Sequence, residues 1–313
     1  MSGPRVLACG LATLDVVQTV ERLPGPDEKI VADGLLVAAG GPAANAAVAA
    51  TALGAPARLL SRVGDGSIGR IVTEDLAAHG VELVDLAGPG HSPAVSTVLV
   101  TRSTGQRAVV SVNATLTRDG GPAAATAAAL ERALDGVRAV LVDGHHLDLA
   151  VPLAAAARGR GVPVLLDGGS WKTGLEALLE HVDVALLSAD FALPARTAET
   201  SSLEDVAALG PAIVARSHGP APIEVLADGT RWTVQAGRVE VVDTLGAGDV
   251  LHGALLAWLA AHRSSEGPTL TAPLGDGLAA AAQVASHSCA ATGARGWLAG
   301  RSSLPALRRL VTG

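Results

Sequence analysis

Residues 243–249 read DTLGAGD, a glycine-rich turn closed by an acidic residue, and their types and spacing suit phosphate chemistry. A long apolar run begins close to Asp249 and predicts a helix there. Glycines let backbone N–H groups face a bound anion without a steric clash, and a helix N-terminus adds roughly half a positive charge at the same point. The stretch therefore predicts an anion-binding turn with a carboxylate, Asp249, at its edge.

Two roles for Asp249 are compatible with this local pattern. An aspartate at the start of a helix is a common N-cap, because its carboxylate accepts hydrogen bonds from the first backbone N–H groups. A carboxylate beside an anion site is also the group that accepts the proton of an attacking hydroxyl in phosphoryl transfer. The turn and the carboxylate alone leave both roles open.

A second glycine pair opens residues 38–53, which read AAGGPAANAAVAATAL. The run of alanines predicts a helix that ends near Gly54. Gly40 and Gly41 then form either a tight strand-to-helix turn or a backbone cradle for a ligand. In the second interpretation, Asn45 lies one turn inside the helix and faces the cradle.

Short apolar strands alternate with helical segments along most of the chain, which predicts a mainly parallel sheet covered on both faces. Other strand-like runs do not fit this alternation, because two of them come early with no helix between them and two more form a hairpin pattern. These runs predict a separate small sheet. Val241 and Val242 are expected to end a strand before the glycine-rich turn. The runs assigned to the small sheet are residues 16–20, 30–37, 96–101 and 107–112.

Composition narrows the class of protein. The chain has 313 residues, 49% of them hydrophobic and 17% charged, which predicts a large core built from alanine, valine and leucine. The net charge of −7 argues against nucleic acid as a partner. Cys9 and Cys289 form no disulfide framework and suit a reducing compartment.

No membrane or export signal is evident in the sequence. Residues 34–57 are uncharged and long enough to cross a bilayer, but Gly40, Gly41, Pro42 and Asn45 interrupt the apolar run. No N-terminal signal peptide is visible. We therefore expect a soluble, cytoplasmic protein with no membrane partner.

The two glycine-rich stretches resemble signatures of the ribokinase (PfkB) family of sugar kinases. Residues 243–249 match its DTxGAGD motif, the glycine pair with Asn45 matches its N-terminal motif, and residues 62–69 (RVGDGSIG) resemble its RVGxDxxG block. The spacing is similar to that of ketohexokinases, and GGPAA and GAGDVLHGAL also resemble sulfofructose kinases. The resemblance implies one ribokinase-like three-layer α/β/α domain over residues 1–313, with lid strands inserted at about 15–38 and 95–112.

The resemblance also implies roles for individual residues. Asp249 corresponds to the general base, and Gly246, Ala247 and Gly248 correspond to the anion hole. Asp243 is implied as a site for a monovalent cation such as K⁺, beside the expected cofactors ATP and Mg²⁺. The implied sugar-binding residues are Asp15, Asp27, Gly40, Gly41, Asn45 and His145. The implied nucleotide-binding residues are Thr244, Gly246, Gly248, Ser217, Gly219 and Ala282.

Three positions depart from the family pattern. Pro42 follows the glycine pair and offers no backbone donor to a sugar. The family's NxxE motif, which helps place magnesium, is replaced at residues 188–191 by SADF. Magnesium is therefore expected mainly with the nucleotide phosphates. His145 stands where sulfofructose kinases have an arginine, which makes a sulfonated sugar a less suitable substrate.

The predicted function is transfer of the γ-phosphoryl group of MgATP to a hydroxyl of a small sugar. The spacing of Asp15, Asp27 and Asn45 favours a ketohexose such as fructose, while ribose, sulfofructose and other family sugars stay open. A homodimer through the lid sheet is expected, because an exposed small sheet seeks a partner.

Three functions of other classes explain less of the sequence than a kinase does. A regulatory module that binds sugar or nucleotide without turnover would account for the missing NxxE motif. A metal-dependent hydrolase rests only on His145 and His146, which would point apart on a regular element. A dinucleotide-dependent oxidoreductase does not fit, because the first strand leads into GLAT at residues 10–13 and not into Gly-x-Gly-x-x-Gly.

Overall fold

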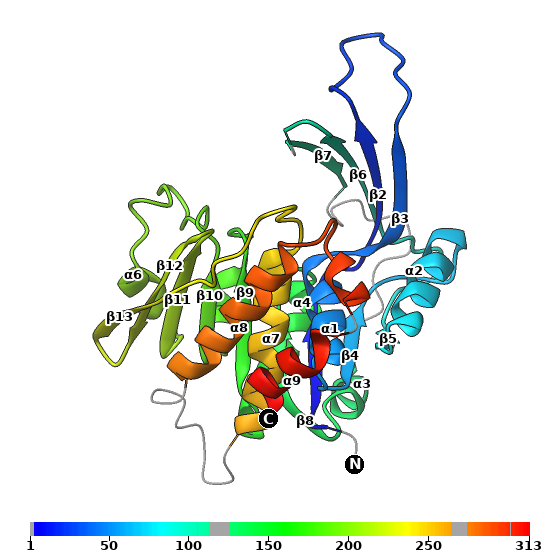
Figure 1. Ribbon diagram of the computed structural model, residues 1–313. Helices are drawn as coiled ribbons and strands as arrows, with labels where there is room; N and C mark the ends of the chain where they lie inside the picture. The colour runs from blue at the N-terminus through cyan, green and yellow to red at the C-terminus, as the bar shows by residue number, and fades with distance from the viewer. Residues whose placement is uncertain (1–2, 105, 113–125, 264–273, 301) are drawn as a thin grey trace.

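The computed structural model describes residues 3–104, 106–112, 126–263, 274–300 and 302–313. Within these residues, a nine-stranded sheet is covered by helices on both faces, and a four-stranded sheet projects from one end of it (Figure 1). This is the three-layer α/β/α arrangement with a small lid that the sequence predicts.

The strand order of the central sheet is β13-β12-β11-β10-β9-β8-β1-β4-β5. The strands from β11 to β5 in this order run parallel, and β12 and β13 add an antiparallel edge. The strands are β1 (Arg5–Cys9), β4 (Ala57–Ser61), β5 (Glu82–Asp85), β8 (Val137–Val142), β9 (Val164–Gly168), β10 (Val184–Leu187), β11 (Ile213–His218), β12 (Ala221–Ala227) and β13 (Thr230–Val234).

Alternate side chains of the parallel strands enter two different cores, one on each face of the sheet. In β1, Val6 and Ala8 belong to one core, and Leu7 and Cys9 belong to the other. This explains why the inner parallel strands are mostly apolar, since neither of their faces meets water.

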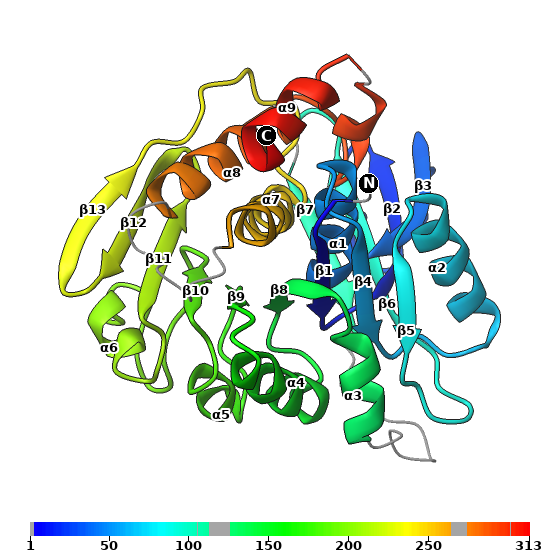
Figure 2. The same ribbon diagram turned by 90° about the horizontal axis from the view of Figure 1, so that it is seen from below.

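The first core lies under α1, α7, α8 and α9, and the second under α3, α4, α5 and α6, as Figure 2 shows on opposite sides of the sheet. Helix α2 packs beside β3 and β5. The helices are α1 (Pro42–Ala52), α2 (Ser67–Ala78), α3 (Ala127–Ala133), α4 (Leu147–Gly159), α5 (Leu175–Leu179), α6 (Leu203–Ala207), α7 (Ala247–His262), α8 (Leu274–Ser288), α9 (Leu304–Thr312) and the 3₁₀ helix η1 (Gly296–Ala299).

Helices α1 and α7 approach each other closely because both present small residues at their contact. A Cβ atom on Gly253 would lie 2.4 Å from the carbonyl oxygen of Ala46, so only glycine fits at that point of α7. Such small-residue contacts let two backbones come together and bring neighbouring side chains within reach. Asn45 directly precedes Ala46 on α1, and Asp249 lies one turn before Gly253 on α7.

The lid consists of β3 (Gly34–Gly40), β2 (Thr13–Val20), β6 (Ala94–Thr101) and β7 (Arg107–Ser111), in that order. Strands β2 and β6 are parallel, and the outer pairs are antiparallel. The predicted separate small sheet is thus confirmed, but β3 starts four residues later than expected from the apolar pattern and continues to Gly40. Gly105, in the turn expected between β6 and β7, lies outside the described residues.

One predicted strand is wrong. Val241 and Val242 lie in an irregular segment between β13 and α7, and their side chains are 59% and 60% exposed. The backbone N–H of Val242 donates to the carbonyl oxygen of Cys289, after α8, instead of to a neighbouring strand. Among the described residues, no helix is both long and apolar enough to cross a membrane.

Candidate active site

Asp249 is the third residue of α7, so the N-cap interpretation is wrong. The N-cap is Gly246, which has a left-handed backbone with φ of 74° and no side chain to cap the helix. The first N–H groups of a helix have no intrahelical acceptor. At the start of α7 the N–H of Ala247 donates to the carbonyl oxygen of Thr244 over 3.2 Å. The N–H groups of Gly248 and Asp249 are therefore the ones that suit an anion, as the glycine-rich turn predicts.

The two glycines of this turn face different surroundings. A Cβ atom on Gly246 would lie 2.5 Å from the Cβ atom of Ala294, so Gly246 is packed tightly on the segment after α8. A Cβ atom on Gly248 would have no atom within 4 Å, so Gly248 borders open space. The turn therefore packs against the segment after α8 at Gly246 and borders open space at Gly248.

Asn45 and Asp249 meet across the contact between α1 and α7. The side-chain amide of Asn45 donates to Oδ2 of Asp249 over 2.7 Å. The pKa of Asp249 is raised to about 7, first by burial and then by the nearby carboxylate of Asp167, while the hydrogen bond from Asn45 opposes the shift. Such a carboxylate exchanges protons near neutral pH, as a general base should.

Two residues to which the sequence analysis gave no catalytic role stand behind Asp249. Asp167, near the end of β9, is buried, and its burial raises its pKa. His252 lies one turn after Asp249; its Nδ1 is 2.7 Å from the carbonyl oxygen of Gly248 and its Nε2 is 3.0 Å from that of Leu186. The imidazole therefore links the first turn of α7 to β10. A histidine inside an otherwise apolar helix was the available sequence signal for this link.

The first glycine pair has the geometry of both a turn and a cradle. β3 ends at Gly40, where a Cβ atom would lie 1.9 Å from Oδ2 of Asp15, so the Asp15 carboxylate rests directly on this glycine. Gly41 is the N-cap of α1, with φ of 97°. Pro42 occupies the first helical position, where its missing N–H costs nothing. Asp15 also accepts a 2.6 Å hydrogen bond from the hydroxyl of Thr13.

Asp27 is not brought to this cradle. Asp15 pairs with Ala38 near the base of the lid hairpin, whereas Asp27 lies in the exposed loop beyond the opposite end of β2 and β3. The strands carry the chain away from Gly40 and Gly41 before this loop begins, so the sugar contact of Asp27 stays a prediction.

His145 and His146 follow β8 and point to different partners. Nδ1 of His145 is 3.1 Å from Asp143, and Nδ1 of His146 is 3.5 Å from the guanidinium of Arg62. Burial alone would raise the pKa of Asp143, but His145 and the N–H of Leu11 hold it at about 2. In the part of the chain that the structure describes, no group of three or more acidic, histidine or cysteine residues could hold a metal ion. The histidine pair therefore supports no metal centre.

The lid reaches the glycine-rich turn through Arg107 of β7. Its Nη2 donates to the hydroxyl of Thr244 over 2.8 Å and to Oδ1 of Asp243 over 3.1 Å. The Asp243 carboxylate also accepts from the N–H groups of Leu245 and Gly293. A cation bound at Asp243 would have to share this carboxylate with the Arg107 guanidinium.

The residues expected on the nucleotide side are only partly suited to it. The hydroxyl of Ser217 points to β10 and donates to the carbonyl oxygen of Leu187 over 3.3 Å. Gly219 lies in the turn between β11 and β12 and has a positive φ. Ala282 is 3% exposed and packed in the core under α8. This burial leaves little of the Ala282 side chain exposed, and its expected nucleotide contact stays a prediction.

The segment that replaces the NxxE motif does not fit a magnesium site. The hydroxyl of Ser188 donates to the carbonyl oxygen of Gly169, Asp190 is exposed, and Phe191 is fully buried against Trp171. A buried phenyl ring offers no oxygen ligand. Residues 188–191 are therefore assigned no metal.

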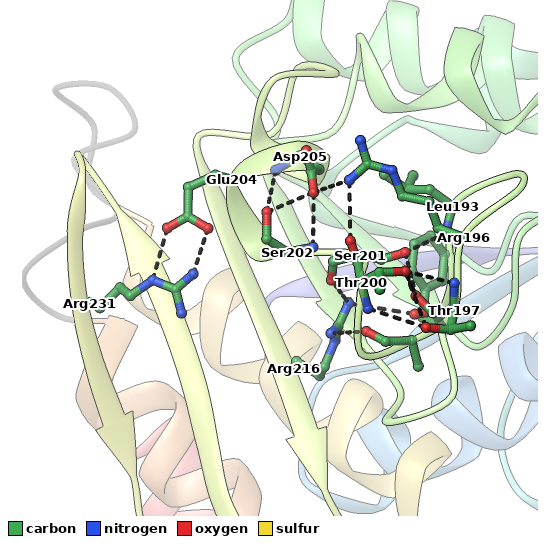
Figure 3. A network of polar contacts seen from close by, with 12 residues as sticks. Leu193, Arg196, Thr197, Thr200, Ser201, Ser202, Glu204, Asp205, Arg216 and Arg231 are labelled. Atoms are coloured by element: carbon green, nitrogen blue, oxygen red, sulfur yellow. Dashed lines mark hydrogen bonds and ion pairs between the residues drawn. The ribbon is translucent and has the colours of Figure 1, made fainter.

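A buried arginine fixes the loop that follows this segment. Arg216 of β11 donates to the carbonyl oxygens of Ala198 and Ser201 over 3.0 and 2.8 Å (Figure 3). The same figure shows the capping box of α6, in which Ser202 and Asp205 exchange hydrogen bonds. These hydrogen bonds hold the loop against β11 and at the start of α6.

The pattern of glycine turns, carboxylate and lid is shared with known proteins. The profile of the pfkB family carbohydrate kinases matches residues 4–297. The chain belongs to this family. Its relatives include an ATP-dependent ribose-1-phosphate kinase of Halopiger xanaduensis, 31% identical over 263 residues that cover 82% of this chain and 85% of that protein. A ribokinase of Arabidopsis thaliana is 26% identical over 284 residues, which cover 84% and 72%.

The fold agrees with this assignment. The structure of the Arabidopsis thaliana ribokinase complexed with ribose and ATP matches with a TM-score of 0.72 at 23% identity, covering 98% of this chain and 99% of that one. As a pfkB carbohydrate kinase, the protein is a phosphotransferase with an alcohol group as acceptor. The predicted family and fold are confirmed. A closer relation to ketohexokinases or sulfofructose kinases stays a prediction.

Proposed function

We propose that this pfkB kinase phosphorylates a small sugar bound between the lid and α1, with Asp249 as the general base. The observation that carries the proposal is the hydrogen bond between Asn45 and Asp249 at the open N-terminus of α7. It places a carboxylate with a pKa near neutrality beside backbone donors suited to a phosphoryl group.

The proposed reaction is an in-line displacement. The sugar hydroxyl attacks the γ-phosphorus of ATP while Asp249 accepts the hydroxyl proton, and the bond from the γ-phosphorus to ADP breaks. The N–H groups around Gly246, Ala247 and Gly248 stabilise the charge on the transferred group. Asp15, Gly41 and Asn45 hold the sugar, and His145 lies near the end of the neighbouring strand. Magnesium bound through the nucleotide phosphates would supply further neutralisation of charge.

The cradle and the named relatives support a choice among the candidate sugars. The two sequence relatives are a ribokinase and a ribose-1-phosphate kinase, which makes ribose the first candidate. Fructose stays a candidate through the spacing of Asp15 and Asn45, although Asp27 lies in the exposed loop between β2 and β3. We further propose that residues 1–313 act as one cytoplasmic domain and that two lids join in a homodimer, since Leu35 and Val110 are exposed there.

The test is ADP release from MgATP with ribose, ribose 1-phosphate, fructose, tagatose, sulfofructose and a nucleoside, each with Na⁺ or K⁺. Turnover that depends on one of these sugars supports the kinase and names its substrate class. The absence of a carboxylate at Phe191 favours a second candidate, a sugar-binding regulatory module. Calorimetric sugar binding without ADP release would support that module and contradict the kinase.

The first prediction concerns pH. Because Asp249 acts only when ionised and its pKa is about 7, kcat/KM for the sugar should rise through neutrality and level off above it. The measurement is kcat/KM from about pH 5.5 to about pH 9 at saturating MgATP. The KM for ATP at each pH is the control for ionisation of the nucleotide. A plateau that already begins below about pH 6 would contradict this assignment of the base.

The second prediction concerns Arg107. Arg107→Ala removes the two hydrogen bonds that join the lid to Thr244 and Asp243, and we expect kcat/KM to fall about tenfold, the size of one charge-assisted hydrogen bond. The freed Asp243 carboxylate should also make the variant more responsive to K⁺ than the wild type. Arg102→Ala, which breaks the exposed lid pair with Asp33, is the matched control. Equal losses in both variants would contradict a specific role of Arg107.

A further inference from the structure

Arg295 lies behind Asn45 and contacts it directly. It is the N-cap residue of η1, and its side chain is 12% exposed. Its Nε donates to Oδ1 of Asn45 over 3.1 Å, and its Nη1 donates to Oδ1 of Asp75 over 2.6 Å. One guanidinium therefore connects the residue that contacts Asp249 to a second, half-buried carboxylate.

The contact with Arg295 determines which way the amide of Asn45 points. A guanidinium has only donors, so the carbonyl oxygen of Asn45 must face Arg295 and its NH₂ group must face Asp249. The carboxylate of Asp249 then accepts a hydrogen bond on Oδ2. A released amide could turn its carbonyl oxygen towards Asp249, and two acceptors facing each other would favour the protonated carboxyl.

The other end of Arg295 is tied to the lid. Asp75, on α2, accepts the backbone N–H of Ala39 in β3 over 2.9 Å. Ala39 precedes Gly40, on which the carboxylate of Asp15 rests. Nδ1 of His79 also lies 3.0 Å from Asp75. The contacts thus run without a break from the base of the lid to Asp249.

The chain next to Arg295 supports the anion-binding turn. The N–H of Gly293 donates to Asp243 over 2.8 Å, and Ala294 packs against Gly246. Arg295 is the next residue of the same segment, so the support of the turn and the setting of the Asn45 amide are built from three consecutive residues.

We propose that Arg295 is a positioning residue for phosphoryl transfer: it fixes the Asn45 amide as a donor to Asp249 and couples this setting to the lid through Asp75. The proposal rests on the role of Asp249 proposed above. Arg295 touches neither the reacting atoms nor the anion-binding turn through its own side chain, so it acts through Asn45.

The charged groups around Asp249 set the direction of the expected effect. Asp167 and Asp143 face it from β9 and the end of β8 and raise its pKa, and His252 faces it from α7 and lowers it. Asp15 and Asp75 face Arg295 from the lid and α2. Removing Arg295 takes away a positive charge and frees the amide, and both changes favour the protonated form of Asp249.

The experiment compares the pH profiles of kcat/KM for wild type, Arg295→Met and Arg295→Lys. Arg231→Met, which breaks the exposed pair between Arg231 and Glu204, is the matched control. In Arg295→Met the pKa that defines the acidic limb of the kcat/KM profile should rise by about one unit. The rate at pH 7 should then fall about fivefold and recover at high pH, as the ionised fraction of the base does. The KM for the sugar should change less than about threefold.

A uniform loss at every pH with an unshifted limb would overturn the proposal, because it indicates a purely structural role. If Arg295→Met does not fold, Arg295→Lys decides. Its single ammonium cannot fork to Asn45 and Asp75 together, so an upward shift of its limb supports the proposal and an unchanged limb overturns it. A wild-type protein without sugar-dependent ADP release would instead contradict the proposed function itself.

Discussion

Asp249→Asn should lower kcat by roughly 10²–10⁴-fold, the usual contribution of a general base, while sugar and ATP still bind. Asparagine has almost the same shape as aspartate but accepts no proton at neutral pH. Its amide can keep a hydrogen bond with Asn45, which now meets Oδ2 of Asp249 over 2.7 Å. The loss should therefore be in the chemical step and not in the assembly of the site.

The decisive measurement is the rate of ADP release at saturating sugar and MgATP, beside calorimetric titration of both ligands. Asp228→Asn, at an exposed turn between β12 and β13, is the matched control for the same chemical change. Retention of full activity in Asp249→Asn would remove Asp249 from the mechanism. Loss of ligand binding would assign Asp249 to binding instead.

The Asp249→Asn variant should lose activity without losing thermal stability. The folded-state pKa of Asp249 lies above its unfolded value, so between the two values the folded protein binds more protons than the unfolded chain. Stability contributed by this proton is present at low pH and is lost as pH rises through about 7. Asp249→Asn removes this partly buried charge, and we expect its melting temperature above neutral pH to equal or exceed that of the wild type.

The sequence predicted the parts of the site that are local. The turn at residues 243–249 and the glycine pair before α1 are short-range patterns, since a positive φ or a close backbone approach demands glycine wherever it occurs. Both lie where expected, at φ of 74° for Gly246 and 97° for Gly41. The apolar strands were also predictable, because burial on both faces leaves no room for polar residues.

The parts of the site that were missed depend on contacts between distant segments. Asn45 meets Asp249 across 204 positions, and Arg295 meets Asn45 across 250. No local pattern marks Arg295, because its role arises only when η1, α1 and α2 pack together. Val241 and Val242 show the reverse error: two β-branched residues indicate a strand, but the chain there hydrogen-bonds to the end of α8.

Gly248→Ala should fold normally and lose roughly 10- to 100-fold in kcat/KM for ATP, because a methyl group there displaces the phosphoryl group from its donors. The space beside Gly248 is open, with no atom within 4 Å of a built Cβ, and the residue is already helical. Gly159→Ala in α4 is the matched control, since it also adds a methyl group to a helical glycine in open space. Equal activity of the two variants would show that no phosphate occupies the front of the turn.

Gly246→Ala separates this effect from damage to the fold. Its Cβ atom would lie 2.5 Å from that of Ala294, and φ of 74° disfavours any side chain. We expect a loss of stability of about 1–3 kcal/mol, typical of a strained backbone position, together with the loss of activity. Thermal melting should therefore distinguish the two glycines even where ADP release does not. A lower melting temperature in Gly246→Ala with an unchanged one in Gly248→Ala is the result that assigns the first glycine to the support of the turn and the second to the phosphate.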